Sequence, residues 1–406
     1  MSQDSAESPK RPWAAILAAG VLVLPLGSIY AFSVFLKPLE TLLGASRSEL
    51  ATVFGIAAVC YTLGMNIGPY LFRPLGTAGL FILSALASAG GTAIAALART
   101  FPELAFGYGV LFGIGGGLAF VAIQQGVNLM GMRRTGLVNG YLVSLLPLGA
   151  MLSAPACGWG IARFGVRETL AAMAALLVVS GLVAVGLARF AGMSLGAGVV
   201  RGGNLAGGGI GQRAIFWKLF AVFFLAAAAG LMVLGQAAGI VAAYGGDTTL
   251  AYIATTGLTA AIATARLGGG SLVDRLSVPG VMAGAQIVAC LGAIAVTLTP
   301  TAHVSIAALV AIGVGYGVIS GATAAGIADY WRRDLFGRVA AKVYIAWCAA
   351  AVTLPILAAR LFDLTGSYHT AFIIAGGANL AAALVALTLP RQGAKVATAA
   401  PPGYPR

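Results

Sequence analysis

One basic side chain, Arg266, lies deep inside an apolar segment of the sequence, the run 248–273. A charge in the middle of a membrane-length helix costs about 2.5–3.5 kcal/mol on insertion scales, so such a residue normally faces a bundle interior and has a partner. No Asp or Glu falls in the middle of any apolar segment. The planar guanidinium fits a carboxylate through two parallel hydrogen bonds. Arg266 therefore predicts a binding site for an anion supplied from outside the chain.

Helical spacing adds Thr259 to the same face. It lies seven residues before Arg266, which is about two helical turns. Two other interpretations stay open: the Thr259 hydroxyl can return its hydrogen bond to its own helix, and Arg266 can reach helix-end carbonyls or the membrane surface. The surface is a long reach, because the helix end at Asp274 is roughly 12 Å away along the axis.

Membrane-spanning helices must position these side chains. Of the 406 residues, 60% are hydrophobic and only 9% are charged, whereas a soluble domain carries about 25% charged residues. This composition excludes a soluble enzyme, a disordered protein and a secreted disulfide scaffold. Because one bilayer span needs about 20 apolar residues, the length predicts an all-α membrane protein with twelve transmembrane helices.

Charged or turn-rich breaks separate the apolar segments. The predicted spans are 13–36, 49–72, 77–98, 103–129, 136–161, 168–188, 214–241, 248–273, 279–299, 303–328, 338–360 and 368–389. The longest connection, 190–213, contains nine glycines and indicates a flexible linker. The predicted domains are a tail at 1–12, a six-helix half at 13–189, the linker, a second half at 214–389 and a tail at 390–406.

The basic residues predict the orientation of these spans. With the N-terminus in the cytosol, 17 Lys and Arg residues fall in cytosolic segments and 6 in outer segments. Basic residues are enriched in cytosolic loops of membrane proteins. The bias predicts that both termini and the linker are cytosolic, and it accounts for most of the net charge of +13. We expect a multi-pass protein of a plasma membrane, here a bacterial inner membrane.

The two halves resemble each other. The run Gly-Ile-Gly-Gly-Gly at 113–117 matches Gly-Val-Gly-Tyr-Gly at 313–317, an offset of 200 residues, and Arg73 matches Arg275 at an offset of 202. Agreement at nearly one offset indicates a duplication with parallel topology. A binding site is then expected at mid-membrane between the pseudo-symmetric halves.

The remaining residue types that carry chemistry form no recognisable set. The four cysteines lie inside apolar runs without CxxC spacing, which favours small buried side chains over disulfides or metal ligands. The Gly-rich runs lack the Gly-Lys-Ser/Thr ending of a phosphate loop. No basic stripe with interleaved aromatic residues points to nucleic acid. We therefore expect no enzyme activity, no metal and no cofactor.

Two loop segments carry a family resemblance. Residues 269–275 read Gly-Gly-Ser-Leu-Val-Asp-Arg, and residues 68–76 read Gly-Pro-Tyr-Leu-Phe-Arg-Pro-Leu-Gly. They resemble the cytosolic loop motif of the major facilitator superfamily, and the resemblance extends over about 15–390. It implies the fold of that superfamily.

The motif also implies three gating residues, Asp274, Arg275 and Arg73. Its Asp can pair with a basic neighbour or a helix N-terminus and so hold one conformer closed. In the first half Phe72 stands where the family has this Asp, so a charged latch is not expected there. The alternative for Asp274 and Arg275 is a solvated helix end.

Three further stretches narrow the resemblance: 27–35, 133–140 and 216–236. Together they resemble the oxalate/formate antiporter and monocarboxylate transporter branch of the superfamily. Members of that branch carry a substrate-binding Arg in the eighth span, and this role falls on Arg266.

The same resemblance suggests which other side chains line the pathway. Pores of this fold are lined chiefly by the first, fourth, seventh and tenth spans. Their intramembrane polar residues are Tyr30, Gln124, Gln236 and Tyr316. For each one, a structural hydrogen bond between helices is the alternative to substrate contact.

Two departures from the branch refine the expectation. Relatives that exchange dicarboxylates have a Lys in the eleventh span, and Trp347 stands there in this sequence. One intramembrane cation fits one carboxylate, so we expect a monocarboxylate. Animal proton-coupled carriers have an Asp four residues before the Arg, where Ile262 stands here. A proton as co-substrate therefore lacks an identifiable carrier side chain.

The sequence thus predicts a secondary transporter of small monocarboxylates such as lactate or pyruvate, with Arg266 at the centre of an alternating-access site. The alternative is an organic-anion antiporter of the oxalate/formate type. The expected partners are the small organic anion, a proton as a candidate co-substrate and the lipid bilayer. We expect no nucleic acid partner, and we expect the protein to be a monomer.

Overall fold

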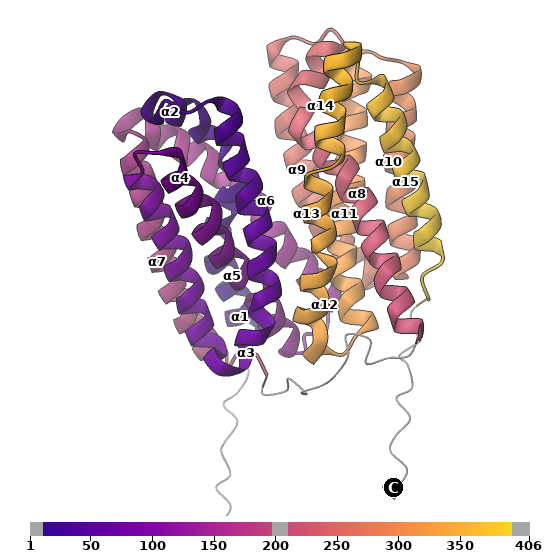
Figure 1. The fold of residues 1–406 in the computed structure, drawn as a ribbon. Coiled ribbons are helices and arrows are strands. Elements are labelled where there is room, and N and C mark those ends of the chain that lie inside the picture. The colour runs from indigo at the N-terminus through magenta and orange to yellow at the C-terminus, as the bar shows by residue number, and fades with distance from the viewer. Residues whose placement is uncertain (1–10, 197–209, 392–406) are drawn as a thin grey trace, which may run out of the picture.

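The computed structural model describes residues 11–196 and 210–391, and every regular element in these ranges is a helix. The predicted tails and residues 197–209 of the predicted linker lie outside the described residues, apart from the few positions next to the helices. Eleven of the described helices are long and apolar enough to cross a membrane. Figure 1 shows them as two upright bundles. The chain is therefore an all-α, multi-pass membrane protein.

The first bundle, here called the N-terminal half, runs from α1 to α7. Its elements are α1 (Pro12–Leu26), η1 (Gly27–Ala31), α2 (Ser33–Leu43), α3 (Arg47–Leu97), α4 (Phe101–Leu104), η2 (Ala105–Phe112), α5 (Gly113–Leu129), α6 (Thr135–Phe164) and α7 (Val166–Phe190). The second bundle, the C-terminal half, runs from α8 to α15. Its elements are α8 (Ile210–Ala243), α9 (Thr248–Val273), α10 (Val278–Leu298), α11 (Ala302–Tyr330), η3 (Arg333–Leu335), α12 (Phe336–Val343), α13 (Ile345–Ala351), α14 (Leu354–Thr365) and α15 (His369–Leu387).

The long element α3 contains two of the predicted spans. Its backbone breaks at Gly76, where φ is 61° and ψ is −170°, a conformation that glycine adopts without steric cost. The spans expected at 49–72 and 77–98 are therefore joined by a kink rather than by an open loop. With α3 counted as two arms, the described residues contain twelve membrane-length segments.

Two of the described spans are interrupted near their own middle. The first contains a 3₁₀ stretch at Gly27–Ala31, and the eleventh is interrupted between α12 and α13 at Tyr344 and again before α14 at Thr353. The span predicted at 338–360 is therefore built from three helical pieces rather than from one continuous helix. Irregular backbone at membrane depth is tolerated where it is buried in protein or lines a cavity.

Helices α6 and α9 bring the two halves into close contact. A Cβ atom on Gly140 of α6 would lie 2.8 Å from the carbonyl oxygen of Arg266 on α9, and Gly136 lies directly against the backbone of Gly270. Only residues without a side chain allow two helices to approach so closely. The helix that carries Arg266 is thus held against the opposite half.

α1 begins and α15 ends at one face of the molecule, here called the terminal face. The N–H of Arg11 donates to the carbonyl oxygen of Ala191, 3.1 Å away, so α7 ends at this face as well. Figure 1 shows the two halves close together toward the terminal face and farther apart toward the opposite face. That the terminal face is cytosolic remains a prediction from the basic residues.

Candidate functional site

A cavity lies at the centre of the molecule, and both halves line it. The N-terminal half contributes Ile29, Tyr30, Tyr61, Met65, Phe120, Val143 and Leu146, and the C-terminal half contributes Phe223, Arg266, Tyr316, Ser320, Tyr344 and Trp347. Its volume is about 40 Å³. One water needs roughly 10–15 Å³ on this scale, so in this conformation the cavity has room only for a small solute.

Arg266 supplies the only charged side chain among these lining residues. It is 6% exposed. Its Nη1 donates to the carbonyl oxygen of Val143 on α6 at 2.9 Å, and its Nη2 donates to the hydroxyl of Tyr316 at 3.0 Å. The guanidinium carbon also lies 5.3 Å from the centre of the Tyr316 ring, within the range of a cation–π contact. Both hydrogen-bond partners are neutral, so the positive charge is not balanced by them.

Polar atoms that line the cavity lack partners among the described residues. The Nε of Arg266 and the hydroxyl of Tyr61 are buried and form no hydrogen bond in the structure. Nearby, the hydroxyl of Tyr344 accepts a long bond of 3.4 Å from Nε2 of Gln124, and Oε1 of this Gln has no partner in residues 11–196 and 210–391. Buried polar groups in native proteins almost always have a partner. The cavity therefore offers unused donors to water or to a ligand.

Aromatic rings form much of the remaining wall. Tyr30 and Trp347 meet edge to face across the two halves, with ring centroids 6.1 Å apart. Tyr344 contacts Phe223 and Phe120 at 5.5 and 6.2 Å. These aromatic rings define the shape of the cavity and provide an apolar surface for a ligand to contact. Polarity is thus concentrated at Arg266 and the tyrosine hydroxyls.

The structure brings four of the predicted substrate residues to this cavity: Tyr30, Arg266, Tyr316 and Trp347. It does not bring the other three to the cavity lining. Gln124 lies beside it on α5, and Gln236 accepts a hydrogen bond from the hydroxyl of Tyr368 at 3.1 Å. The Thr259 hydroxyl donates to the carbonyl oxygen of Thr255 at 2.9 Å, which is the intrahelical alternative.

Sequence reasoning did not assign two important parts of the cavity. The carbonyl oxygen of Val143 is a backbone atom, and because every residue has one, the sequence cannot indicate which of them contacts Arg266. Tyr61 and Tyr344 are visible in the sequence as intramembrane tyrosines, but neither lies in the four spans expected to line the pathway. The breaks in the first and eleventh spans, which carry Tyr30 and Tyr344, follow only from the structure.

Of the three predicted gating residues, only Asp274 forms a hydrogen bond to the opposite half among the described residues. Both carboxylate oxygens of Asp274 accept N–H groups of α6, from Gly136 and from Leu137, at 2.8 Å each. This carboxylate therefore caps the positive end of a helix of the opposite half. Arg73 and Arg275 are exposed at the same face.

Comparisons with known proteins agree with this architecture. The family model described as Major Facilitator Superfamily matches residues 219–403. The uncharacterized MFS-type transporter YhjX of Escherichia coli (strain K12) is 23% identical over 303 residues, which cover 74% of this chain and 75% of that protein.

Solved structures of transporters have a similar fold. The proton:xylose symporter XylE bound to 6-bromo-6-deoxy-D-glucose superposes with a TM-score of 0.72 at 16% identity, covering 94% of this chain and 96% of that chain. The transporter FucP in the outward conformation gives a TM-score of 0.65 at 15% identity, covering 93% and 99%. The likenesses support the superfamily, and the structural ones show its fold.

Proposed function

We propose that this chain, whose fold is that of the major facilitator superfamily, is a secondary transporter of small monocarboxylates. The observation that carries the proposal is Arg266: a buried cation in a central cavity, with neutral hydrogen-bond partners and an unused Nε. A charge-assisted hydrogen bond contributes about 1.5–3 kcal/mol. A substrate carboxylate would balance a charge that the lining residues leave unbalanced.

The cavity chemistry favours an anion over a sugar, although XylE transports xylose with protons. A neutral polyol needs both donors and acceptors around its hydroxyls. The side chains that line this cavity include no Asp, Glu, Asn or Gln. The hydroxyl groups of the lining can both donate and accept, but its one charged group, the guanidinium of Arg266, offers donors alone, which matches a carboxylate.

The size and charge of the cavity favour one carboxylate on a small molecule. A volume of about 40 Å³ leaves little room, and Arg266 is the single cation of the lining. Trp347 lies in the wall at the position where relatives that transport dicarboxylates have a Lys. A dianion bound here would keep one carboxylate unpaired in a low-dielectric site, at a large cost.

The position of the cavity between the halves supports alternating access. The hydrogen bonds between halves described here lie at the cavity and toward the terminal face. FucP, a neighbour of similar fold, was solved in its outward conformation. Rocking of one half against the other would expose Arg266 first to one side of the membrane and then to the other.

Counterflow in proteoliposomes tests this function. Vesicles loaded with unlabelled substrate take up labelled substrate by exchange, so the assay needs no assumed driving force. We expect exchange of lactate or pyruvate and none of xylose. Xylose exchange without carboxylate exchange would overturn the proposal.

The same assay separates the closest alternative, an antiporter of the oxalate/formate type. Oxalate on one side and formate on the other would then exchange, whereas lactate and pyruvate would not. The single cation of the cavity lining predicts that oxalate is not exchanged.

A further inference from the structure

Two helices of this protein begin at the interface between the halves, at positions that the internal repeat relates to each other. Gly136 lies in the first turn of α6, and Gly337 lies in the first turn of α12, at an offset of 201 residues. Each helix start presents N–H groups that have no acceptor within their own helix. Each therefore needs an acceptor from a neighbouring element.

At α6 the acceptor is the carboxylate of Asp274 from the opposite half, described above. The position that corresponds to Asp274 in the first half is Phe72, at an offset of 202 residues. Its ring packs against α12, where a Cβ atom on Gly337 would lie 3.0 Å from a ring carbon. A phenyl ring cannot accept the N–H of Gly337 as a carboxylate would.

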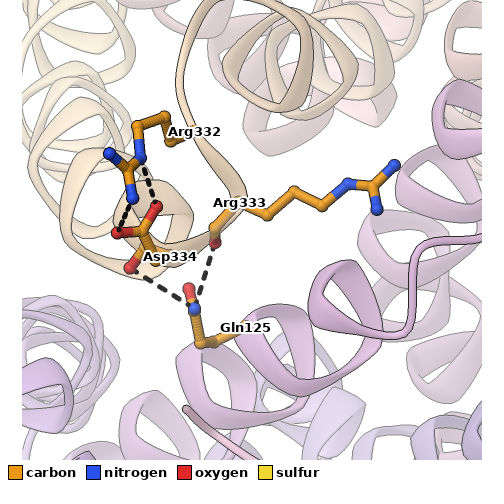
Figure 2. Close-up of polar contacts among 4 residues, drawn as sticks. All are labelled: Gln125, Arg332, Arg333 and Asp334. Atoms are coloured by element: carbon orange, nitrogen blue, oxygen red, sulfur yellow. Dashed lines mark hydrogen bonds and ion pairs between the residues drawn. The ribbon is translucent and has the colours of Figure 1, made fainter. Parts of the chain in front are cut away.

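Gln125 of α5 fills this role from a different helix. Its Oε1 accepts the N–H of Gly337 at 2.6 Å, and its Nε2 donates to the carbonyl oxygen of Arg333 at 3.1 Å. The side chain is almost completely buried. Figure 2 shows it reaching from the N-terminal half to the segment before α12. Both ends of the amide are thus used across the interface.

No charged group of the described residues takes part in the contact between Gln125 and the segment before α12. The carboxylate of Asp334 is engaged by Arg332, at 3.1 and 3.3 Å, so only the backbone carbonyl of Asp334 faces Nε2 of Gln125, at 3.5 Å (Figure 2). The repeat places Ala325 at the position that corresponds to Gln125. Each half therefore has one acceptor, on non-equivalent helices, and one of the two is uncharged.

We propose that Gln125 is a gate residue that holds the terminal face closed, in place of the carboxylate that is missing at position 72. Closure at α6 uses a charge, and closure at α12 uses a neutral amide that both accepts and donates. This inference goes beyond the proposed function and does not depend on the identity of the substrate.

The test measures the ratio of closed to open molecules at the terminal face. Spin labels on cysteines introduced at Arg189 and Leu387, which are exposed on opposite halves, report the distance between the halves by pulsed double electron–electron resonance. The four native cysteines are first replaced by alanine. The reading needs no substrate and no assumed membrane orientation.

Gln125→Met keeps the length of the side chain but removes both polar ends. A buried hydrogen bond of this kind changes an equilibrium constant by a factor on the order of five to ten. We therefore expect the closed-to-open ratio to fall by about that factor. The matched control is Gln286→Met, since Gln286 is also fully buried, on α10, and neither end of its amide has a partner among the described residues. The control should leave the ratio unchanged.

Two further variants distinguish a gate from a general packing defect. Gln125→Glu keeps the acceptor for the N–H of Gly337, where a negative charge is favourable, but replaces the donor that faces the carbonyl oxygen of Arg333 with a second oxygen. Its closed-to-open ratio should therefore fall between the ratios of the wild type and of Gln125→Met. Adding Phe72→Asp to Gln125→Met should restore closure. If Gln125→Met and Gln286→Met give the same ratio, or if Gln125→Glu opens the face as far as Gln125→Met does, the inference is wrong. Should the Met variant fail to fold, the Glu variant is compared with the wild type and with Gln286→Met, and a ratio equal to theirs overturns the inference.

Discussion

The central cavity and the closure at the terminal face both join the two halves, but they differ in how completely their polar atoms are paired. At the terminal face, both oxygens of Asp274 and both ends of the Gln125 amide have partners in the opposite half. In the cavity, Nε of Arg266 and the hydroxyl of Tyr61 have none among the described residues.

This difference separates two kinds of interface. A fully paired contact stabilises one arrangement of the halves and has no capacity left for a ligand. Buried polar atoms without partners raise the free energy of the empty cavity. A ligand that forms hydrogen bonds with these atoms removes this penalty, and the released free energy contributes to its binding. This difference supports the proposal that the terminal face is a gate and that the cavity is a binding site. Variants at the two regions should affect different measurements.

The largest effect on the gate is expected for Asp274→Ala. It leaves two N–H groups of α6 without their carboxylate, and hydrogen bonds to charged groups contribute about 1.5–3 kcal/mol each. With the spin labels described above, the closed-to-open ratio should fall by more than tenfold. An unchanged ratio would mean that water replaces this carboxylate without cost, and the terminal face would not be a gate at Asp274.

A smaller effect, confined to the cavity, is expected for Tyr316→Phe. The substitution removes the hydroxyl that accepts from Nη2 of Arg266 at 3.0 Å but keeps the ring. The guanidinium loses one restraint, so the substrate dissociation constant should rise by roughly five- to tenfold. Calorimetric titration measures this, and the spin-label ratio should stay at the wild-type value. A change in that ratio without a change in affinity would reverse the roles assigned here.

The smallest effect is expected for Tyr61→Phe. Its hydroxyl is buried without a partner in the described part of the chain, so its removal should change the melting temperature of the ligand-free protein little or raise it. In contrast, substrate affinity should fall by a few-fold if the ligand pairs with this hydroxyl. A marked loss of ligand-free stability would show that Tyr61 already has a structural partner, and the comparison between the two regions would weaken.

The sequence predicted much of the fold and the centre of the site. Apolar segment lengths gave the spans because the bilayer thickness fixes them. Arg266 was identified because a deep cation is costly without a role. Asp274 was assigned through a motif, and the structure pairs it with a helix N-terminus, one of the two partners that were expected.

The remaining parts depend on contacts between helices that the sequence does not specify. Gln124 and Gln125 are adjacent and identical in type, so only the direction of each side chain separates one near the cavity from one at the gate. The Val143 carbonyl became a partner of Arg266 because glycines let α6 and α9 approach. The breaks around Tyr30 and Tyr344 lie in segments whose apolar pattern is that of continuous helices.

Ligand-induced thermal stabilisation of purified Arg266 variants tests the central claim most directly. A ligand at 100 times its dissociation constant stabilises the folded state by about 2.7 kcal/mol, so lactate or pyruvate should raise the melting temperature of the wild type. Arg266→Lys keeps a charge without the planar fork and should show a strongly reduced shift, and Arg266→Gln should show none. If Arg266→Gln keeps the full shift, Arg266 is structural and the cavity described here is not the carboxylate site.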